Sequence, residues 1–277
     1  MQKLDGLTYH LTGRLDAGNG GARRAKGQGG SLEFSDFRAY TAGDDMRRID
    51  WNAYARQDKL FVKRFTEEKQ ATVNFFLDTS ASMGFGDGAK GLYAKQLAAS
   101  LGYIFLKNTD KVNLFAVRDD LRRDCGGLAT KSRFPEWVNA LEMLVFGGET
   151  ALEAALTQAR TQRLGSGISF VISDFFSADG FEDGALALAQ KGQAVVLVLL
   201  LSAEEARPEV DGQVRLMDAE TGQARDIRVT AEVLLQYAKA LAAHQERIKA
   251  FCARHGFGYV YADTGMHPLE TVGRLML

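Results

Sequence analysis

The sequence predicts an α/β fold in which a doubly wound, mostly parallel sheet is flanked by helices. From residue 72 onwards, short apolar runs alternate with helical patterns, which is typical of parallel strands joined by crossover helices. The longest apolar run, residues 194–201, indicates a strand buried inside the sheet. The chain has 277 residues, 46% of them hydrophobic, and is therefore long enough for one large domain with a smaller appendage.

We divide the chain into an N-terminal segment, residues 1–70, and an α/β domain, residues 71–277. Residues 13–31 contain seven glycines and several basic residues, which predicts a flexible loop. In residues 32–70, charges of both signs alternate with aromatic residues, and this favours a compact segment with Trp51 in an aromatic core. The charged residues expected to form an ion-pair network there are Arg38, Asp44, Asp45, Arg47, Arg48 and Asp50.

The other elements follow from hydrophobic periodicity. Strands are predicted at residues 59–65, 72–78, 111–117, 168–173, 194–201 and 257–262. Apolar residues on one helical face predict helices around residues 97–105 and 137–144, and further helices are expected at 151–163 and 231–254. Two short strand patterns on either side of a turn with Gly222 predict an inserted β-hairpin at about residues 207–230.

Composition and charge exclude several classes of function. The formal net charge of −1 gives no overall attraction to nucleic acid or to an anionic membrane. The two cysteines, Cys125 and Cys252, are too few and too far apart for a disulfide scaffold or a zinc site. No stretch approaches the ~18 apolar residues of a membrane span, so we expect a cytoplasmic protein with no membrane span.

A polar cluster follows the first buried strand of the α/β domain. Asp78, Ser80 and Ser82 alternate along a turning loop, so that one carboxylate and two hydroxyls can converge on a single point. Thr150 precedes a predicted helix, and Asp174 ends another buried strand. Because the carboxyl ends of parallel strands line the ligand crevice, these five residues form a plausible site for a hard cation such as Mg²⁺.

This pattern resembles the metal-ion-dependent adhesion site of von Willebrand factor A domains. The order and spacing of Asp78-x-Ser80-x-Ser82, Thr150 and Asp174 carry the resemblance, which covers about residues 71–277. It implies that these five residues bind Mg²⁺, or another divalent cation such as Mn²⁺ or Ca²⁺. It also implies that the ion binds an acidic side chain of a partner protein, so that the chain is a binding protein and not an enzyme.

The N-terminal segment and the hairpin resemble the bacterial domain-of-unknown-function family fifty-eight. The matching motifs are Glu33-Phe34-Ser35-Asp36-Phe37-Arg38-x-Tyr40, Gly43-Asp44-Asp45, Arg47-Arg48-Ile49-Asp50-Trp51, Ala53-x-Ala55-Arg56 and Asp218-x-Glu220-Thr221-Gly222. The family resemblance implies a MoxR-type AAA+ ATPase as partner. It further implies a chaperone-like role in the maturation or assembly of client proteins.

Other interpretations of the same residues compete with this one. Ser82, Asp174 and His267 occur in the chain order of an α/β-hydrolase triad, which indicates a metal-assisted or serine hydrolase as the alternative function. The glycines of residues 84–89 resemble a weak dinucleotide-binding loop, and the basic loop suggests a nucleic-acid contact. Each Ser and Thr is also a common helix cap, and it is the joint pattern that favours a metal site.

Overall fold

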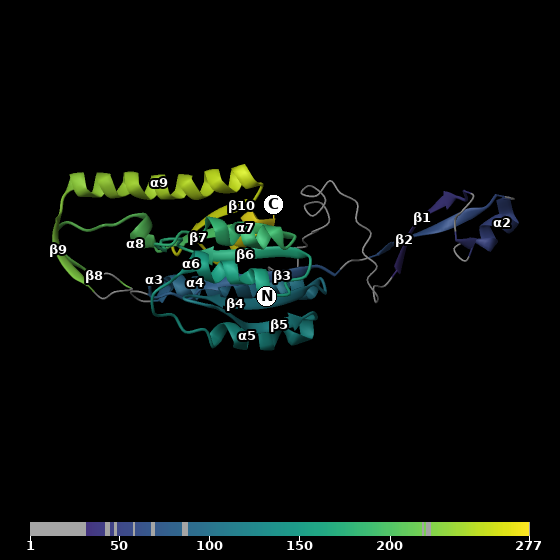
Figure 1. Cartoon of the computed structure of the whole chain (residues 1–277), viewed down its shortest axis with the longest axis horizontal. Coiled ribbons are helices and arrows are strands. Elements are labelled where there is room, and N and C mark those ends of the chain that lie inside the picture. Colours follow the sequence, from purple (N-terminus) through teal and green to yellow (C-terminus); the bar gives the residue numbers. More distant parts are fainter. Residues whose placement is uncertain are drawn as a thin grey trace. The chain divides into compact units, whose positions relative to one another are not determined.

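The computed structural model describes residues 32–41, 45–46, 49–57, 59–67, 70–84, 88–217, 219 and 223–276. These residues form two compact units that divide at Ala71, and Figure 1 shows the strands and helices of each. The predicted glycine-rich loop at residues 13–31 lies outside the described part of the chain. Most of the predicted hairpin turn, including Gly222, also lies outside it.

The N-terminal unit is built on a two-stranded antiparallel sheet. Strand β1 (Leu32–Ala39) pairs with β2 (Phe61–Glu67), and helix α2 (Trp51–Gln57) lies between them in the sequence. Asp50 caps this helix, because its Oδ1 accepts the backbone N–H groups of Asn52 and Ala53 at 3.0 and 3.2 Å. Of the predicted ion-pair network, Asp44, Arg47 and Arg48 lie outside the described residues.

The prediction that Trp51 belongs to an aromatic core is wrong. Its side chain is 60% exposed and makes an edge-to-face contact with Tyr54. Trp51 is the first residue of α2, directly after the cap. The buried position is taken instead by Ile49, which forms a bridge with the buried Val62 of β2.

The second unit contains a six-stranded sheet in the order β10-β7-β6-β3-β4-β5. The strands are β3 (Thr72–Asp78), β4 (Lys111–Val117), β5 (Leu121–Leu128), β6 (Gly167–Ser173), β7 (Gln193–Leu201) and β10 (Gly258–Asp263). All strands of this sheet are parallel except β5, which pairs antiparallel with β4 at one edge. This arrangement confirms the predicted α/β fold with a doubly wound, mostly parallel sheet.

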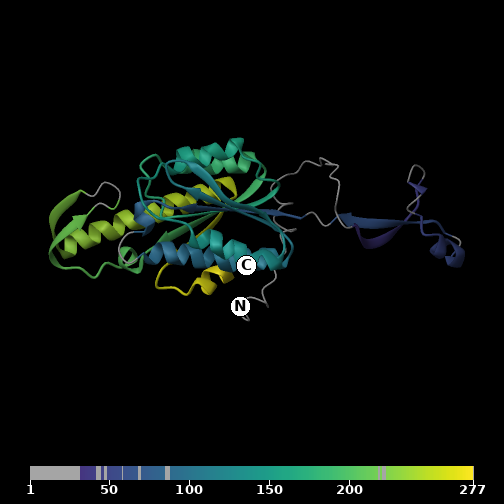
Figure 2. The same cartoon turned by 90° about the horizontal axis from the view of Figure 1, so that it is seen from below.

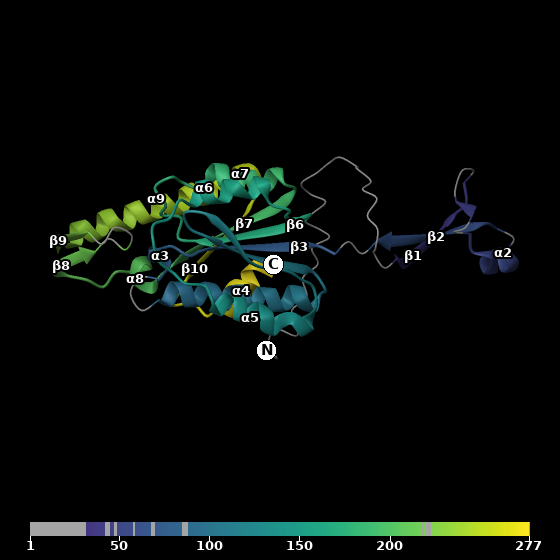
Figure 3. The same cartoon turned by 60° about the horizontal axis from the view of Figure 1, so that its bottom comes forward.

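Helices cover both faces of the sheet (Figures 2 and 3). One face carries α4 (Ala89–Lys107), α5 (Phe134–Glu142) and α10 (Pro268–Met276). The other carries α6 (Leu152–Thr157), α7 (Glu182–Gln190) and α9 (Ala231–His255). Neighbouring residues of β3 face opposite sides, so that Phe75 joins the first core cluster and Phe76 the second. Shorter elements are α3 (Ala81–Gly84), α8 (Ala203–Ala206) and 3₁₀ turns at Lys131–Arg133 and Gln158–Thr161.

The inserted hairpin is present as β8 (Gly212–Met217) and β9 (Ala224–Val229). Figures 1 and 3 show the hairpin and the first half of α9 extending past the end of the sheet where α3 and α8 begin. That end is the carboxyl end of the parallel strands, because α3 follows β3 and α8 follows β7. In this first half of α9, Leu235 is 56% exposed and Tyr237 is 38% exposed.

A buried row of polar side chains crosses four neighbouring strands. Asn113 of β4 donates to Asn74 of β3 at 2.8 Å, and Asn74 donates to the side chain of Gln193 of β7 at 2.8 Å. Ser169 of β6 donates to the same Gln193 oxygen at 2.9 Å. A shift of one residue in strand pairing would turn these groups to the opposite face, where they would lose their partners. The row therefore helps to fix the register of the sheet.

We expect Asn74→Ala to lower the free energy of unfolding by about 2–4 kcal/mol, because it removes the acceptor of the buried Asn113 amide and one of the two donors to Gln193 Oε1. Urea unfolding measures this loss, and the slope of the transition should stay unchanged. The matched control is Asn139→Ala, at an exposed position of α5. Equal stability losses in the two variants would contradict a role for the buried row.

Candidate metal centre

The candidate site lies where the direction of sheet winding reverses. β3 lies between β4 and β6, and the helices that follow β3 and β6 pack on opposite faces of the sheet. The connections therefore separate at the carboxyl ends of these two strands, which is where open α/β sheets commonly bind their ligands. Asp78 is the last residue of β3, and Asp174 directly follows β6. The fold thus brings two carboxylates from distant parts of the sequence to one end of the sheet.

The loop after β3 folds back so that its backbone hydrogen-bonds to the carboxylate of Asp78. Asp78 Oδ1 accepts the backbone N–H of Ser80 at 2.9 Å, and Asp78 Oδ2 accepts the hydroxyl of Ser173 at 2.6 Å. The hydroxyl oxygens of Ser80 and Ser82 lie 3.0 Å apart. Asp78 and Ser80 are fully buried. The predicted Asp-x-Ser-x-Ser loop therefore does gather its oxygen atoms on one side.

The loop with Thr150 crosses from one face of the sheet to the other beside this first loop. The backbone N–H of Gly147 donates to the carbonyl of Thr79, and that of Ala81 donates to the carbonyl of Gly148, both at 2.9 Å. Gly148 has a φ of +82°, a backbone conformation that favours glycine. Thr150 Oγ1 is buried, and among the described residues it is the one buried side-chain oxygen or nitrogen that has no hydrogen-bond partner.

The third loop, after β6, is held by a tight turn. Phe175 has a φ of +56°, and the backbone N–H of Phe176 donates to Asp174 Oδ1 at 3.2 Å. The backbone carbonyl of Asp174 lies 2.9 Å from His244 Nε2 of α9, and Phe176 stacks on the His244 ring with centroids 4.5 Å apart. The middle of α9 is thereby attached to the loop that carries Asp174.

The two carboxylates influence each other electrostatically. Burial and the nearby negative charge of Asp174 raise the pKa of Asp78 to about 6, although the hydrogen bonds from Ser173 and Ser80 act in the opposite direction. Two interacting carboxylates are stable in a protein interior only when positive charge compensates their negative charges.

Lys90 supplies such a positive charge and was not among the predicted site residues. Its side chain is 3% exposed, and its Nζ lies 2.9 Å from Asp174 Oδ2 and 2.7 Å from Glu205 Oε1. Burial acts to lower the pKa of Lys90, but the two carboxylates outweigh it and raise the pKa. The sequence does contain a signal, because Lys90 shares one helical face with the buried Ala94, Leu97 and Leu101. A lysine in such a stripe needs a buried partner.

The donor set fits a hard divalent cation. Asp78 and Asp174 offer carboxylate oxygens, and Ser80, Ser82 and Thr150 offer hydroxyl oxygens, which suit Mg²⁺, Mn²⁺ or Ca²⁺. The Thr150 hydroxyl oxygen is buried and has no hydrogen-bond partner, so it is available to coordinate an ion. Among the described residues, no group of three or more His, Cys, Asp or Glu side chains is placed to hold a metal. A bound ion would therefore depend on the hydroxyls.

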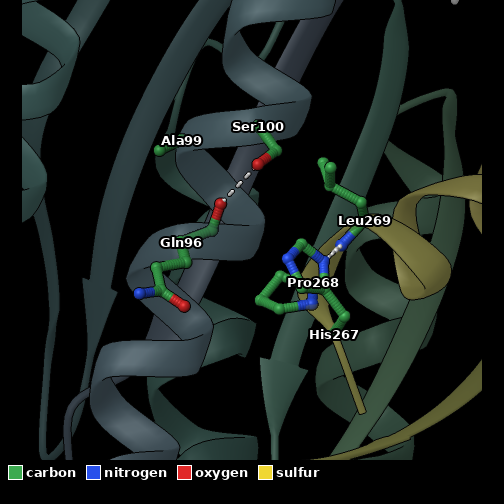
Figure 4. A pocket seen from close by; sticks show the side chains of 6 residues that line it. All are labelled: Gln96, Ala99, Ser100, His267, Pro268 and Leu269. Carbon is green, nitrogen blue, oxygen red and sulfur yellow. Dashed lines mark hydrogen bonds between the residues drawn. The ribbon is translucent and has the colours of Figure 1, made fainter. Parts of the chain in front are cut away.

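The residues of the hydrolase alternative have other partners. Ser82 bonds to Ser80, and Asp174 bonds to Lys90. His267 Nδ1 accepts the backbone N–H of Leu269 at 3.2 Å, in a shallow pocket between α4 and α10 (Figure 4). Two glycines of the dinucleotide-binding alternative, Gly84 and Gly88, are described. An added Cβ at Gly84 would lie 2.6 Å from the Cβ of Phe146, which explains that glycine by packing.

Comparison with known proteins gives a family. A family model described as "Protein of unknown function DUF58" matches residues 36–247. An uncharacterised protein of Mycobacterium tuberculosis is 25% identical over 256 residues, which cover 88% of this chain and 75% of that protein.

Solved structures are also similar to this chain. The crystal structure of BatB, a conserved hypothetical protein of Bacteroides thetaiotaomicron, has a TM-score of 0.44 and 19% identity, and the match covers 74% of this chain and 95% of BatB. A von Willebrand factor type A protein of Catenulispora acidiphila has a TM-score of 0.39 and 19% identity, with 52% of this chain and 36% of that one covered.

We expect Thr150→Val to raise the free energy of unfolding in EDTA by about 1 kcal/mol, because it replaces an unpaired buried hydroxyl with a methyl group of the same shape. Urea unfolding is the measurement. Thr161→Val is the matched control, since the Thr161 hydroxyl donates to the carbonyl of Gln158 on the surface. A stability loss of more than about 1 kcal/mol in Thr150→Val would show that the hydroxyl has a partner in the fold.

The pKa of Asp78 predicts a pH-dependent stability in metal-free buffer. This pKa is about 6 in the fold, above its ordinary value of 3.8, so the contribution of Asp78 to stability is complete below pH 3.8 and is lost as the pH rises through 6. We expect Asp78→Asn to be more stable than the unchanged protein by about 3 kcal/mol near pH 7.5, and equally stable near pH 4. Urea unfolding in EDTA across this range tests it, and a difference that stays constant with pH would contradict it.

Proposed function

Because the chain belongs to the DUF58 family and has a von Willebrand factor A-like fold, we propose that it is a metal-dependent protein-binding adaptor. In this proposal, Asp78, Ser80, Ser82, Thr150 and Asp174 hold a divalent cation, with Mg²⁺ as the first choice. The cation supplies an open coordination position for an acidic side chain of a partner protein. A von Willebrand factor A-like fold is consistent with a role in protein interaction.

The buried, unpartnered hydroxyl of Thr150 is the observation that carries the proposal. A hydroxyl in this state costs about 1–3 kcal/mol, so a fold that keeps it gains a compensating interaction elsewhere. Backbone hydrogen bonds of Gly147 and Gly148 join the Thr150 loop to the Asp78–Ser82 loop, which supports including the Thr150 hydroxyl in the proposed donor set. Three of the five proposed donors are uncharged hydroxyls, which bind a divalent ion without adding further negative charge to the site.

Exposed apolar side chains beside the site provide further contact area for a partner. Phe176 is 49% exposed and lies two residues after Asp174. Tyr237 of α9 is 38% exposed, and its hydroxyl donates at 2.8 Å to the backbone carbonyl of Glu205, whose side chain binds Lys90. Side chains of this type are enriched at the centres of protein interfaces.

The proposed partners are a MoxR-type AAA+ ATPase and its client proteins, in a chaperone-like maturation or assembly process. The family resemblance supports this choice. No Gly-Lys-Ser or Gly-Lys-Thr sequence of an ATP-binding loop occurs in the chain, so ATP hydrolysis would belong to the partner. We therefore place the proposed complex in the cytoplasm, where ATP is available.

The proposal assigns the chain a binding role, with hydrolysis as the weaker alternative. In the described residues, Ser82, Asp174 and His267 each bond to groups outside the triad. None of the described helices combines the length and apolar character that crossing a membrane requires.

We expect the protein to bind Mg²⁺, and Thr150→Val to weaken that binding at least tenfold, because the substitution removes one ligand without changing the fold. Isothermal titration with MgCl₂ measures the affinity, and thermal unfolding with Mg²⁺ or EDTA gives an independent reading. Thr161→Val should bind as tightly as the unchanged protein. Equal affinities of both variants, or no binding by any of them, would contradict the metal site.

The partner is tested by affinity capture from the lysate of the source cell. The bait is the unchanged protein or Thr150→Val, each with Mg²⁺ or EDTA, and captured proteins are identified by mass spectrometry. We expect an AAA+ ATPase or a discrete client to be retained by the unchanged protein with Mg²⁺ and lost in the other three conditions. Equal recovery in all four conditions would contradict binding through a metal.

A further inference from the structure

Lys90 lies in the first turn of α4, and its ammonium group has two carboxylate partners from different segments of the chain. Asp174 follows β6, and Glu205 lies in α8 after β7. The lysine side chain and Asp174 are almost completely buried, whereas the Glu205 side chain is 32% exposed. The ammonium is therefore shared between a buried carboxylate and a carboxylate that reaches solvent.

Asp174 is thereby already bound to a cation. Its Oδ2 accepts from Lys90 Nζ, and its Oδ1 accepts the backbone N–H of Phe176. A divalent ion that draws on Asp174 has to share this carboxylate with the ammonium or displace it. Glu205 offers the ammonium a second partner at 2.7 Å in the same position.

We propose that Lys90 is a built-in cation that competes with the divalent ion for Asp174 and so sets the affinity of the site, with Glu205 holding the ammonium when the ion is bound. This inference rests on the proposed function and adds its regulation. In the metal-free protein, Lys90 compensates the negative charge of Asp174. When the ion binds, its charge takes over that compensation, and the Lys90–Glu205 pair remains.

The competition links the site to the surface beside it. Glu205 also caps α8: its carboxylate accepts the backbone N–H of Ser202 at 2.7 Å, and its own N–H donates to the Ser202 hydroxyl at 3.0 Å. Its backbone carbonyl accepts the hydroxyl of Tyr237 on α9. When metal binding changes how the Lys90 ammonium is shared between Asp174 and Glu205, the local charge therefore changes next to the exposed first half of α9.

A purely structural ion pair would behave differently from a competing cation. Breaking a structural pair lowers stability but leaves the affinity for a divalent ion unchanged. A competing cation has opposite effects on the two quantities, since its removal destabilises the metal-free protein and strengthens metal binding. Affinity and stability measured on the same variants therefore distinguish the two roles.

The test titrates MgCl₂ into the full chain and into Lys90→Met, Glu205→Gln and the double variant, and it records thermal unfolding in EDTA. We expect Lys90→Met to unfold at a lower temperature in EDTA and to bind Mg²⁺ at least about tenfold more tightly, because a positive charge close to the ion is gone. Glu205→Gln should bind Mg²⁺ more weakly, because the ammonium then has Asp174 as its single carboxylate. In the double variant the Glu205 substitution should have no further effect, because its influence acts through Lys90.

The outcomes separate this inference from the proposed function. Unchanged or weaker Mg²⁺ binding by Lys90→Met, in a protein whose Thr150→Val variant does lose binding, would overturn the competition and leave the metal site intact. If neither the unchanged protein nor Lys90→Met binds Mg²⁺, both the competition and the metal site are overturned. Binding by Lys90→Met alone would support the competition in its strongest form. If Lys90→Met does not fold, Glu205→Gln decides, and an unchanged affinity in that variant would overturn the inference.

Discussion

Two carboxylates buried at the same end of a sheet impose a constraint on everything around them. Asp78 and Asp174 repel each other, and each needs donors or positive charge to remain in the interior. Ser173, the start of α4 and the loop after β3 all contribute to this compensation. Because the helices after β3 and β6 leave in opposite directions, this is also the place where open α/β sheets commonly bind a ligand. Charge compensation and the expected position of a ligand therefore coincide in the fold.

The α/β architecture was predictable because burial on both faces leaves long apolar runs in the sequence. The bounds of β3 and β4 agree with the predicted strands at 72–78 and 111–117. Strand β5 was missed because its exposed face carries Arg122, Arg123 and Asp124, which have no strand-like pattern. The prediction for Trp51 was wrong because large aromatic side chains are usually buried, whereas here the local turn buries Ile49 and leaves Trp51 exposed.

The candidate metal ligands could be selected from residue type and spacing, because oxygen donors after buried strands gather at one edge of a parallel sheet. Whether they bind a metal remains a prediction. Lys90, Glu205 and His244 were not selected, because their roles depend on which helices pack over the loops, and periodicity does not encode that. Sequence patterns thus indicate the ligands better than the groups that hold them.

The antiparallel edge strand β5 has a consequence for how the sheet meets other protein chains. β5 pairs irregularly with β4 and carries an Arg122–Asp124 ion pair at 2.9 Å on its exposed surface, followed by Gly126 and Gly127. Charges and irregular pairing make an edge a poor template for another strand. This edge of the sheet is therefore protected from pairing with strands of other molecules and from nucleating fibrous aggregates.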